Sequence, residues 1–459
     1  MKKRKGGWWQ LKNLMKLKSI FIANLAEIAR PLAQFMSQKA REEEIFEDNA
    51  YCDRFLFSEE DNRLLVTPFP LDKQFVKDVS SLLGFKNLTV LHPKKIGESI
   101  CESILKDSKL NQKLREIISQ NPGISLCSYA ATPEFLELTK FLKKKGLSFH
   151  TPEIPIETKL WTASFFDSKA GFRQAVSAWL KNFPKMPKGA ICSSKAEILG
   201  WADYFLKAKE GVVLKTNRGL SGAGMRIIRR KDIKGKKTTE FIKKILGQEP
   251  YWQKEATVVE ELIEPDLKVC GGAPSVELKV NDQGVIPLYA CGMRISSQGV
   301  FKGVKFGKKA VPPKIEKILF KAGKKFARFL FSLGYQGFFD IDWVYGKNGQ
   351  VYPLEANLRR TGGTHAYELA KRLLGNDFLN KYYLVSQMKT SAPRFKNKTY
   401  AFLKAKLDSF FYPIKGKKEG VILTVLNYLK KGKLGYTIIG PNKKRVGQIE
   451  KNLLKSLYQ

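Results

Sequence analysis

Between residues 49 and 155, short apolar runs alternate in regular order with amphipathic runs. The apolar runs have the length of strands and read NRLLVTPFP, NLTVLHP, GISLCSYA and LSFHTP. The amphipathic runs between them predict helices at 73–83, 98–118 and 132–145. Strands that alternate with helices are typical of a parallel sheet covered on both faces. We therefore expect an α/β domain over 49–155.

The pattern changes after residue 155, where helices mix with hairpins. The strand-like runs are GVVLKTN, GMRIIRR, ATVVEELIE and SVELKV. Helical periodicity predicts helices at 168–180 and 313–333, and alternating periodicity predicts a hairpin at 337–357. This mixture indicates an α+β domain over 156–390, with lobes of about 156–260 and 261–390.

Two basic segments flank these domains. Residues 391–459 still contain the strand-like runs GVILTVL and YTIIG and a final helix, so we expect a basic folded C-terminal region. The basic N-terminal segment 1–48 interleaves lysines with apolar residues, namely Trp8, Trp9, Leu11, Leu14 and Leu17. We expect a docking helix or a loose tail, and the alternative is that residues 1–36 lie on an anionic membrane surface. Because no run of eighteen apolar residues occurs, we expect no spanning helix.

The net charge of +39 is the unusual global feature. Such a surface attracts nucleotides, nucleic acid and anionic lipid alike. Recognition helices, RNP-like strands and finger spacings are not visible, so we expect a solvated basic surface and no specific nucleic-acid partner. The six cysteines include no C-x-x-C pair, which argues against a zinc site or a disulfide framework. Scattered cysteines fit a reducing compartment, and we expect a cytoplasmic location.

The strongest local pattern is the acidic hairpin GFFDIDWVYGKNGQVYPLEANL. The Asn-Gly dipeptide at 348–349 suits a two-residue type I′ turn. Counting back from that turn places Asp342 opposite Glu355, and Asp340 opposite Asn357, all on one face. Opposed carboxylates destabilise a sheet, and a divalent cation would remove that penalty because carboxylate and amide oxygens suit magnesium. The alternative is an acidic face that meets water or lysines.

The other face of this hairpin is apolar and is expected to join a core, through Phe339, Ile341, Trp343, Leu354 and Ala356. Pro353 cannot donate a hydrogen bond to the ladder. Its strand is therefore expected at a sheet edge, or bulged at that position.

Upstream, GVVLKTNRGLSGAGMRII places Lys215 in an apolar strand ahead of a glycine-rich loop. The candidate phosphate contacts in this loop are Gly219, Ser221, Gly222 and Gly224. Glycines let backbone N–H groups approach phosphate oxygens closely. The loop opens into a strand, so it is neither a Walker loop nor a dinucleotide fingerprint. A glycine hairpin unrelated to phosphate is the alternative. Further on, TVVEELIEPD is a strand whose end could pair with an adenine edge.

Together these motifs resemble the ATP-grasp superfamily, in which a glycine-rich hairpin covers the phosphates and D…E-x-N binds magnesium. The step from Asp342 to Glu355, with Asn357 following, is the step found in D-alanine–D-alanine ligases. An α/β domain in front and EANLRRTGGTH behind are similar to the branch with a pre-ATP-grasp domain. The known type of that branch is the peptide ligase of pheganomycin biosynthesis. The resemblance covers about 50–440 and implies a parallel-sheet pre-ATP-grasp domain followed by a two-lobed ATP-grasp domain, an α/β protein overall.

The resemblance also implies roles for single residues. The metal ligands would be Asp342, Glu355 and Asn357. The nucleotide contacts would be Arg173 (where relatives carry a lysine), Lys215, the glycine loop, Glu260, Glu261 and Leu262, with Glu264 or Asp266 at the ribose. The residues that steady a transferred phosphate would be Arg294, Arg359 or Arg360. His365 is either a base near the amine or, as we prefer, a structural residue of the following helix.

The implied reaction is an ATP-dependent ligation with Mg2+, or Mn2+ in its place. A carboxylate is activated as an acyl phosphate and joined to an amine, with amino acids or peptides as substrates. One alternative is a catalytically inactive ATP-binding regulatory protein. Another is a basic adaptor for nucleic acid or a membrane surface. The oligomeric state stays open.

Overall fold

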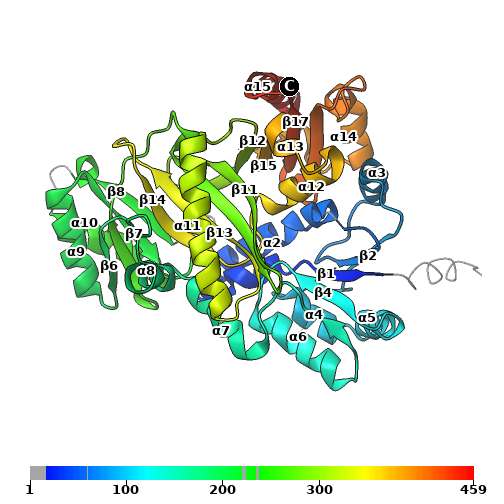
Figure 1. Cartoon of the computed structure of the whole chain (residues 1–459), viewed down its shortest axis with the longest axis horizontal. Coiled ribbons are helices and arrows are strands. Elements are labelled where there is room, and N and C mark those ends of the chain that lie inside the picture. The colour runs from blue at the N-terminus through cyan, green and yellow to red at the C-terminus, as the bar shows by residue number, and fades with distance from the viewer. Residues whose placement is uncertain (1–16, 59, 220–223, 234–236, 459) are drawn as a thin grey trace, which may run out of the picture.

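The computed structural model describes residues 17–58, 60–219, 224–233 and 237–458. Within these residues the chain forms a five-stranded, a four-stranded and an eight-stranded sheet. Figure 1 shows the four-stranded sheet at the left end, the eight-stranded sheet in the middle and the five-stranded sheet at the lower right. The architecture is mixed α/β, with a parallel N-terminal sheet and antiparallel sheets after it, as the sequence predicts.

The five-stranded sheet is parallel throughout, in the order β3-β2-β1-β4-β5. Its strands are β1 (Ser19–Ile22), β2 (Arg63–Val66), β3 (Leu88–Leu91), β4 (Ile124–Ser128) and β5 (Phe149–His150). Alternate side chains enter different cores, since successive residues of a strand point to opposite faces. Ile20 and Ile22 face one core, whereas Phe21 faces another. The sheet is therefore buried on both faces.

The helices of this domain begin and end where capping residues allow. They are α3 (Lys73–Leu83), α4 (Ile100–Lys106), α5 (Ser108–Gln120) and α6 (Pro133–Lys144). Gly84 ends α3 in the left-handed conformation, with φ 64°. The single helix expected at 98–118 is in fact two, because Asp107 has an extended backbone and its side chain accepts from Leu110 N.

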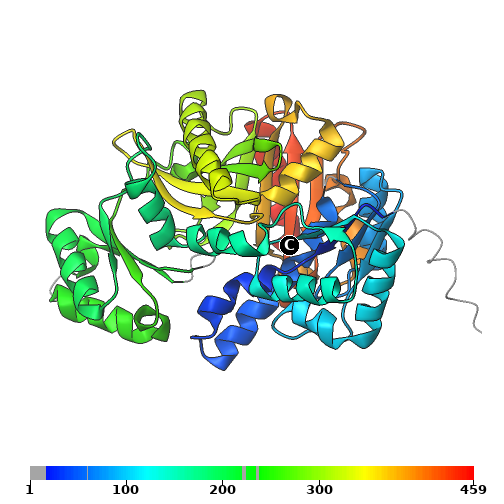
Figure 2. The same ribbon diagram turned by 60° about the horizontal axis from the view of Figure 1, so that its bottom comes forward.

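The expectation of a separate basic segment over 1–48 is wrong for its described part. Ser19–Ile22 forms the central strand β1, and Leu17 is buried in the same core. The chain then continues through η2 (Leu25–Ala29), α1 (Arg30–Ala33), α2 (Gln38–Ala50) and η3 (Tyr51–Phe57). Leu32 packs into the core of the four-stranded lobe, so this segment connects both ends of the molecule (Figure 2). Trp8, Trp9, Leu11 and Leu14 lie outside the described residues.

The four-stranded sheet forms a small lobe with its own core. Its antiparallel order is β6-β9-β7-β8, from β6 (Gly189–Cys192), β7 (Gly211–Thr216), β8 (Met225–Arg229) and β9 (Thr257–Glu261). The helices α9 (Lys195–Ala208) and α10 (Thr238–Gln248) supply apolar side chains to that core.

The eight-stranded antiparallel sheet has the order β14-β13-β10-β11-β12-β15-β17-β16. Its strands are β10 (Pro274–Asn281), β11 (Gly284–Ile295), β12 (Phe301–Gly307), β13 (Gly337–Tyr345), β14 (Val351–Asn357), β15 (Tyr383–Ser391), β16 (Gly420–Val425) and β17 (Lys433–Gly440). The helices α7 (Leu160–Phe166), α8 (Lys169–Ala178) and α11 (Pro313–Ser332) pack against the end that carries β13. The expected boundary at 390/391 falls inside this sheet, because β15 pairs with both β12 and β17. The C-terminal region is therefore part of the sheet and not a separate unit.

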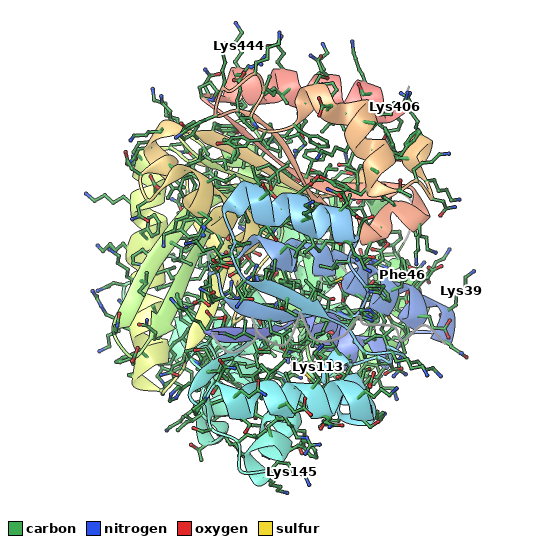
Figure 3. The ribbon with its side chains drawn as sticks, turned by 90° about the vertical axis from the view of Figure 1, so that its right-hand side faces the viewer. Lys39, Phe46, Lys113, Lys145, Lys406 and Lys444 are labelled. Carbon is green, nitrogen blue, oxygen red and sulfur yellow. The ribbon has the colours of Figure 1, made fainter. Side chains whose placement is uncertain are left out.

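The largest core joins the two ends of the chain. Phe21, Leu65 and Cys127 of the parallel sheet share it with the C-terminal strands and with α12 (Thr364–Leu374) and α15 (Lys443–Tyr458). In the described ranges no helix is long and apolar enough to cross a bilayer. Lysines are spread over the surface of several elements: Figure 3 labels Lys39, Lys113, Lys145, Lys406 and Lys444 on different parts of the molecule.

Candidate active site

The acidic hairpin has the expected cross-strand pairs but a different turn. Asp342 pairs with Glu355, and Asp340 pairs with Asn357. The turn, however, is not a two-residue type I′ turn. Gly349 N donates to Gly346 O at 2.9 Å with Gly349 at φ 76°, which makes the loop one residue longer. The longer loop alone would displace every pair in the hairpin by one residue on one strand.

A β-bulge restores the register before the acidic pairs. The pairing shifts between Asp342 and Trp343, where Trp343 lies opposite Pro353 and Leu354 is the extra residue. Pro353 is buried and Leu354 is half-buried, so the proline takes the inward position expected of the leucine. The strand is also the edge of the sheet, as expected of a strand that contains proline.

The acidic side chains lie together on one face of the hairpin. Asn357 Nδ2 donates to Asp340 Oδ1 at 2.8 Å and to Asp342 Oδ2 at 3.3 Å. Burial and the neighbouring Glu355 raise the pKa of Asp342 to about 7. Burial, followed by Asp342 and Glu277, raises the pKa of Asp340 well above its ordinary value. Asp342 Oδ1 is buried without a hydrogen-bond partner. The protein therefore balances only part of the negative charge of these carboxylates.

Glu355 is paired with a lysine that the sequence interpretation did not assign. Lys169 Nζ lies 2.7 Å from Glu355 Oε2, and Lys215 is the next strongest electrostatic neighbour. Burial alone would raise the pKa of Glu355, but these two lysines lower it. The acidic face therefore meets a lysine, as in the alternative considered above, while Asp342 keeps an unpaired oxygen.

The start of α8 holds the acidic hairpin and the glycine hairpin together. Asp167, just before the helix, accepts from Leu358 N at 2.7 Å and pairs with Arg359. Lys169 N donates to Asn217 O and Ala170 N to Asn217 Oδ1, both at 3.0 Å. One short segment thus fixes the position of the magnesium candidates relative to the loop that follows β7.

The two cations expected at the phosphates converge on one carboxylate. Lys215 Nζ is 2.6 Å from Glu260 Oε2, and Arg173 Nη2 is 2.5 Å from Glu260 Oε1. Burial alone would raise the pKa of Glu260, but Lys215 and Arg173 lower it. Arg173 therefore occupies a position beside Lys215, as the motif alignment implies. Glu260 lies in β9 as expected, but its carboxylate forms ion pairs with these two cations.

The glycine hairpin is described only at its two ends. Thr216 N donates to Gly224 O at 2.8 Å, which closes the hairpin. Gly224 has φ 76°, and a Cβ on it would overlap Thr216 Oγ1, so only glycine suits this position. Gly219 follows β7 and is half-buried. Ser221 and Gly222 lie outside the described residues.

The other nucleotide candidates line the strand end and the linker after it. Glu261 Oε2 pairs with Lys209 at 3.0 Å, and Leu262 N donates to Gly211 O at 3.0 Å. Glu264 accepts from Arg229 at 3.1 Å, and Asp266 accepts from Lys268 N at 3.0 Å. Both acids expected at the ribose are therefore part of the linker that runs beside the hairpin tip, where Pro265 bridges Gly346.

The three candidate arginines have different surroundings. Arg359 Nη2 donates to Asn357 Oδ1 at 2.8 Å, which places it against the metal candidates. Arg294 instead pairs with Glu450 of α15 at 2.5 Å. Cys291 and Asp342 lie on the same face of the sheet, because both pair with Ser275. Arg294 is three residues after Cys291 on the same strand, so its side chain points to the opposite face. Arg294 is thus not brought to the acidic pair.

Arg360 is a buried structural link. It contacts Glu153 at 3.0 Å and Glu368 at 2.7 Å and stacks on Phe338 at 4.1 Å. His365 is also buried, and burial together with Arg54 holds its pKa well below the ordinary value. A neutral, enclosed imidazole fits the structural role expected for it.

The sequence interpretation missed Asp167, Lys169 and Asn217. Lys169 and Arg173 are four residues apart on one helix, so they share a face, and this spacing could have identified the pair. Asp167 and Asn217 carry no such local signal, because their contacts join segments far apart in the chain.

The residues present fit a magnesium ion with a polyphosphate. Among the described residues there is no cluster of three His, Cys, Asp or Glu side chains that would enclose a metal by itself. Mg2+ is usually held by one or two carboxylates and completes its shell with water and phosphate. Asp342 and Glu355 supply two carboxylates, the free Oδ1 of Asp342 supplies an unused ligand atom, and Lys215 and Arg173 supply cations.

Comparisons with known proteins agree with this fold. Residues 52–143 match the family model described as the Pre ATP-grasp domain. No curated protein sequence matches the chain. N5-carboxyaminoimidazole synthase from Aspergillus clavatus, solved with ADP and 5-aminoimidazole ribonucleotide, is similar over 96% of this chain and 99% of its own, with 9% identity and a TM-score of 0.55.

Two further solved structures are similar over nearly the whole chain. Biotin carboxylase from Campylobacter jejuni covers 95% of this chain and 90% of its own, with 13% identity and a TM-score of 0.56. N5-carboxyaminoimidazole synthetase from Staphylococcus aureus, complexed with ADP, covers 96% and 98%, with 12% identity and a TM-score of 0.52. At such identities the likeness establishes the fold alone. The chain thus has the fold of these three structures, and its residues 52–143 match the Pre ATP-grasp domain.

Proposed function

We propose that this protein is an ATP- and magnesium-dependent ligase that joins a carboxylate to an amine, with an amino acid or a short peptide among its substrates. The observation that carries the proposal is the opposed pair Asp342 and Glu355, with a buried, unpartnered carboxylate oxygen, beside Lys215 and Arg173. Solved proteins with this fold bind ADP and MgADP in their crystal structures, which supports the choice of nucleotide and metal.

The chain's residues would divide the work as follows. Asp342, Glu355 and Asn357 would hold a magnesium ion, which would supply positive charge to a bound polyphosphate. Lys215 and Arg173 exchange their contacts with Glu260 for contacts with phosphate oxygens.

The carboxylate substrate would attack the γ-phosphorus, giving an acyl phosphate and ADP. The amine would then displace phosphate from the acyl carbon, with loss of a proton. Arg359 is fixed by Asp167 and Asn357 next to the metal ligands, and it would steady the anion in both steps. Positioning and electrostatics account for such a reaction without a protein nucleophile.

The double substitution Asp342→Asn with Glu355→Gln tests the proposal. Each change keeps the shape of the side chain and removes a negative charge, so the protein should fold and its ATP turnover should fall at least about a thousandfold. ADP release would be measured with ATP, magnesium and pooled amino acids and peptides, and products identified by mass spectrometry.

Two results would count against the proposal. Turnover that survives the double substitution would contradict the metal assignment. Wild-type protein that binds ATP but releases no substrate-stimulated ADP with a broad panel would instead favour the regulatory alternative. The matched control is Glu316→Gln on α11, a carboxylate without a place in the site.

A further inference from the structure

The outer face of α11 carries a straight row of cations, called here the basic stripe. Its members are exposed and follow one another at steps of three, four, three and four residues: Lys314, Lys317, Lys321, Lys324 and Arg328. This spacing places one cation on each turn of the same helix face, over a length of about 21 Å. The opposite face of α11 packs on β10 and β11, so the basic stripe points away from the sheet (Figure 1).

The basic stripe does not stabilise the helix that carries it. In α6, by contrast, Lys140 pairs with Glu137 three residues earlier. The single acid of α11 is Glu316, which is half-buried and whose pKa is raised by burial. Among the described residues no acid pairs with a member of the stripe. Like charges one turn apart repel, and Lys314 lies at the positive end of the helix dipole. The helix would therefore be more stable without this row.

Three half-exposed aromatic rings gather at the C-terminal end of the basic stripe. Phe331 continues the stripe by three residues and is 46% exposed. Trp179, at the end of α8, is 50% exposed and stacks on Phe329 with ring centres 5.8 Å apart. Trp161 of α7 is 49% exposed and packs on Phe166, which in turn contacts Phe329. The protein thus holds three large apolar groups in water beside a row of cations.

We propose that the basic stripe and these three rings dock on the surface of a bilayer that contains anionic phospholipids. The cations would contact the charged groups of the lipids, and the rings would enter the headgroup layer. The net charge of +39 attracts the protein to such a surface. Ile341 packs in the core under α11, so Asp342, the next residue of β13, points to the other face of the sheet. The docking surface is therefore independent of the proposed ligase function.

The arrangement suits a membrane better than a strand of nucleic acid. The outward face of a helix is convex and can touch a plane along its whole length. Proteins that hold single strands generally combine a basic groove with rings on which successive bases stack. Here the rings form one group beyond the last cation of the stripe and do not alternate with the cations. Tryptophan beside lysine is typical of the interface between a bilayer and water.

The test neutralises the middle of the basic stripe in the full chain, with Lys317→Gln, Lys321→Gln and Lys324→Gln combined. Sedimentation with vesicles of phosphatidylserine and phosphatidylcholine, or of phosphatidylcholine alone, measures binding at about 0.15 M salt. The wild type should bind the anionic vesicles, and the triple variant should bind them about a hundredfold more weakly, since each lysine contributes about fivefold. Its melting temperature should stay the same or rise, because repulsion within the helix is removed.

The matched control removes the same charge from exposed positions elsewhere. It combines Lys39→Gln in α2, Lys406→Gln in α14 (Tyr400–Leu407) and Lys444→Gln in α15 (Figure 3). These lysines would act on the bilayer only from a distance, where salt screens them. Their loss should weaken vesicle binding by less than about threefold, and ATP turnover should be unchanged in both triple variants.

The rings are tested by the depth that they reach. Vesicles whose lipid chains carry bromine quench the fluorescence of tryptophans that enter the bilayer. Trp161→Phe combined with Trp179→Phe should reduce the quenched part of the emission. Phe331→Ala should weaken binding about fivefold at low and at high salt, because it removes an apolar contact and no charge.

Four results would overturn the proposal. The first is a wild type that does not bind anionic vesicles at about 0.15 M salt. The second is equal weakening in both triple variants, which would assign binding to net charge alone. The third is quenching that survives loss of Trp161 and Trp179, which would place the contact on another segment. The last is single-stranded RNA that loses its binding in the stripe variant while vesicle binding remains, which would assign the stripe to nucleic acid.

Discussion

At the scale of single residues, every cation of the candidate site is held by a carboxylate of the protein. Lys169 pairs with Glu355, Arg359 pairs with Asp167, and Glu260 holds both Lys215 and Arg173. When phosphate binds, these cations would therefore exchange a protein carboxylate for phosphate oxygens. Such an exchange keeps the cations in place before the nucleotide arrives, so that less ordering is required on binding.

The first prediction concerns Glu260→Gln. The substitution leaves two buried cations without their counter-charge, so we expect a loss of about 3 kcal/mol in the stability of the small lobe. MgATP should restore more stability to this variant than it adds to the wild type, because phosphate oxygens replace the lost carboxylate. Thermal unfolding with and without MgATP measures both effects.

The control for Glu260→Gln is Asp203→Asn. Asp203 forms an i,i+4 pair with Lys207, which is mostly exposed, and exposed pairs contribute at most about 1 kcal/mol. A Glu260→Gln protein that is as stable as this control, or that gains nothing extra from MgATP, would contradict the exchange of partners.

At the scale of elements, the hairpin shows what the sequence could and could not predict. The acidic pairs were predicted from an Asn-Gly turn, and they are present. The turn is nevertheless longer, and the bulge at Leu354 compensates for the added residue, so two unpredicted features cancel. A bulge depends on how an edge strand fits the sheet beside it, and no local pattern of residues reveals that fit.

Strand β1 shows a different limit of the sequence interpretation. Its residues, Ser19–Ile22, make only one short apolar run inside a basic segment, so a tail or docking helix was expected. Their place in the centre of a parallel sheet depends on pairing with β2 and β4, which lie about forty and a hundred residues away. The roles of Asp167 and Asn217 were hidden for the same reason. Long-range contacts decide these positions.

The second prediction concerns Gly224→Ala at the end of the glycine hairpin. Alanine would have to adopt a positive φ, and its Cβ would overlap Thr216 Oγ1. We expect a loss of about 1–3 kcal/mol in the small lobe and a KM for ATP raised about tenfold, because the loop no longer closes in register. Steady-state kinetics and thermal unfolding measure these changes.

Gly200→Ala is the matched control for this variant. Gly200 lies on an exposed face of α9, and a Cβ there meets nothing within 4 Å. It should gain up to about 1 kcal/mol, since alanine favours a helix over glycine, and leave the KM unchanged. Unaltered ATP binding in Gly224→Ala would show that the loop end does not position the nucleotide.

At the scale of the whole molecule, one large hydrophobic core is built from distant parts of the chain, and the small lobe has a separate core. One core contains residues from β1, β2 and β4 as well as from β15, β16, β17 and α15, so the two ends of the chain stabilise each other. The small lobe has a core of its own and joins the rest through Leu32, the linker after β9 and the contacts of α8. The parallel sheet thus shares a core with the C-terminal region, whereas the small lobe has a core of its own.

The third prediction follows from this division and is tested by hydrogen exchange. Amides of β1 and β17 should exchange at similar slow rates, because opening either strand disrupts the same core. Amides of β7 and β9 should exchange at least about tenfold faster, since a lobe of roughly seventy residues buries too little apolar surface to be as stable alone. MgATP should slow exchange in β7 and β9 most, because the nucleotide would contact both lobes and couple their opening.

Fast exchange in β1 with slow exchange in β17 would contradict the shared core. A small lobe as protected as β17 before any nucleotide is added would contradict its independence.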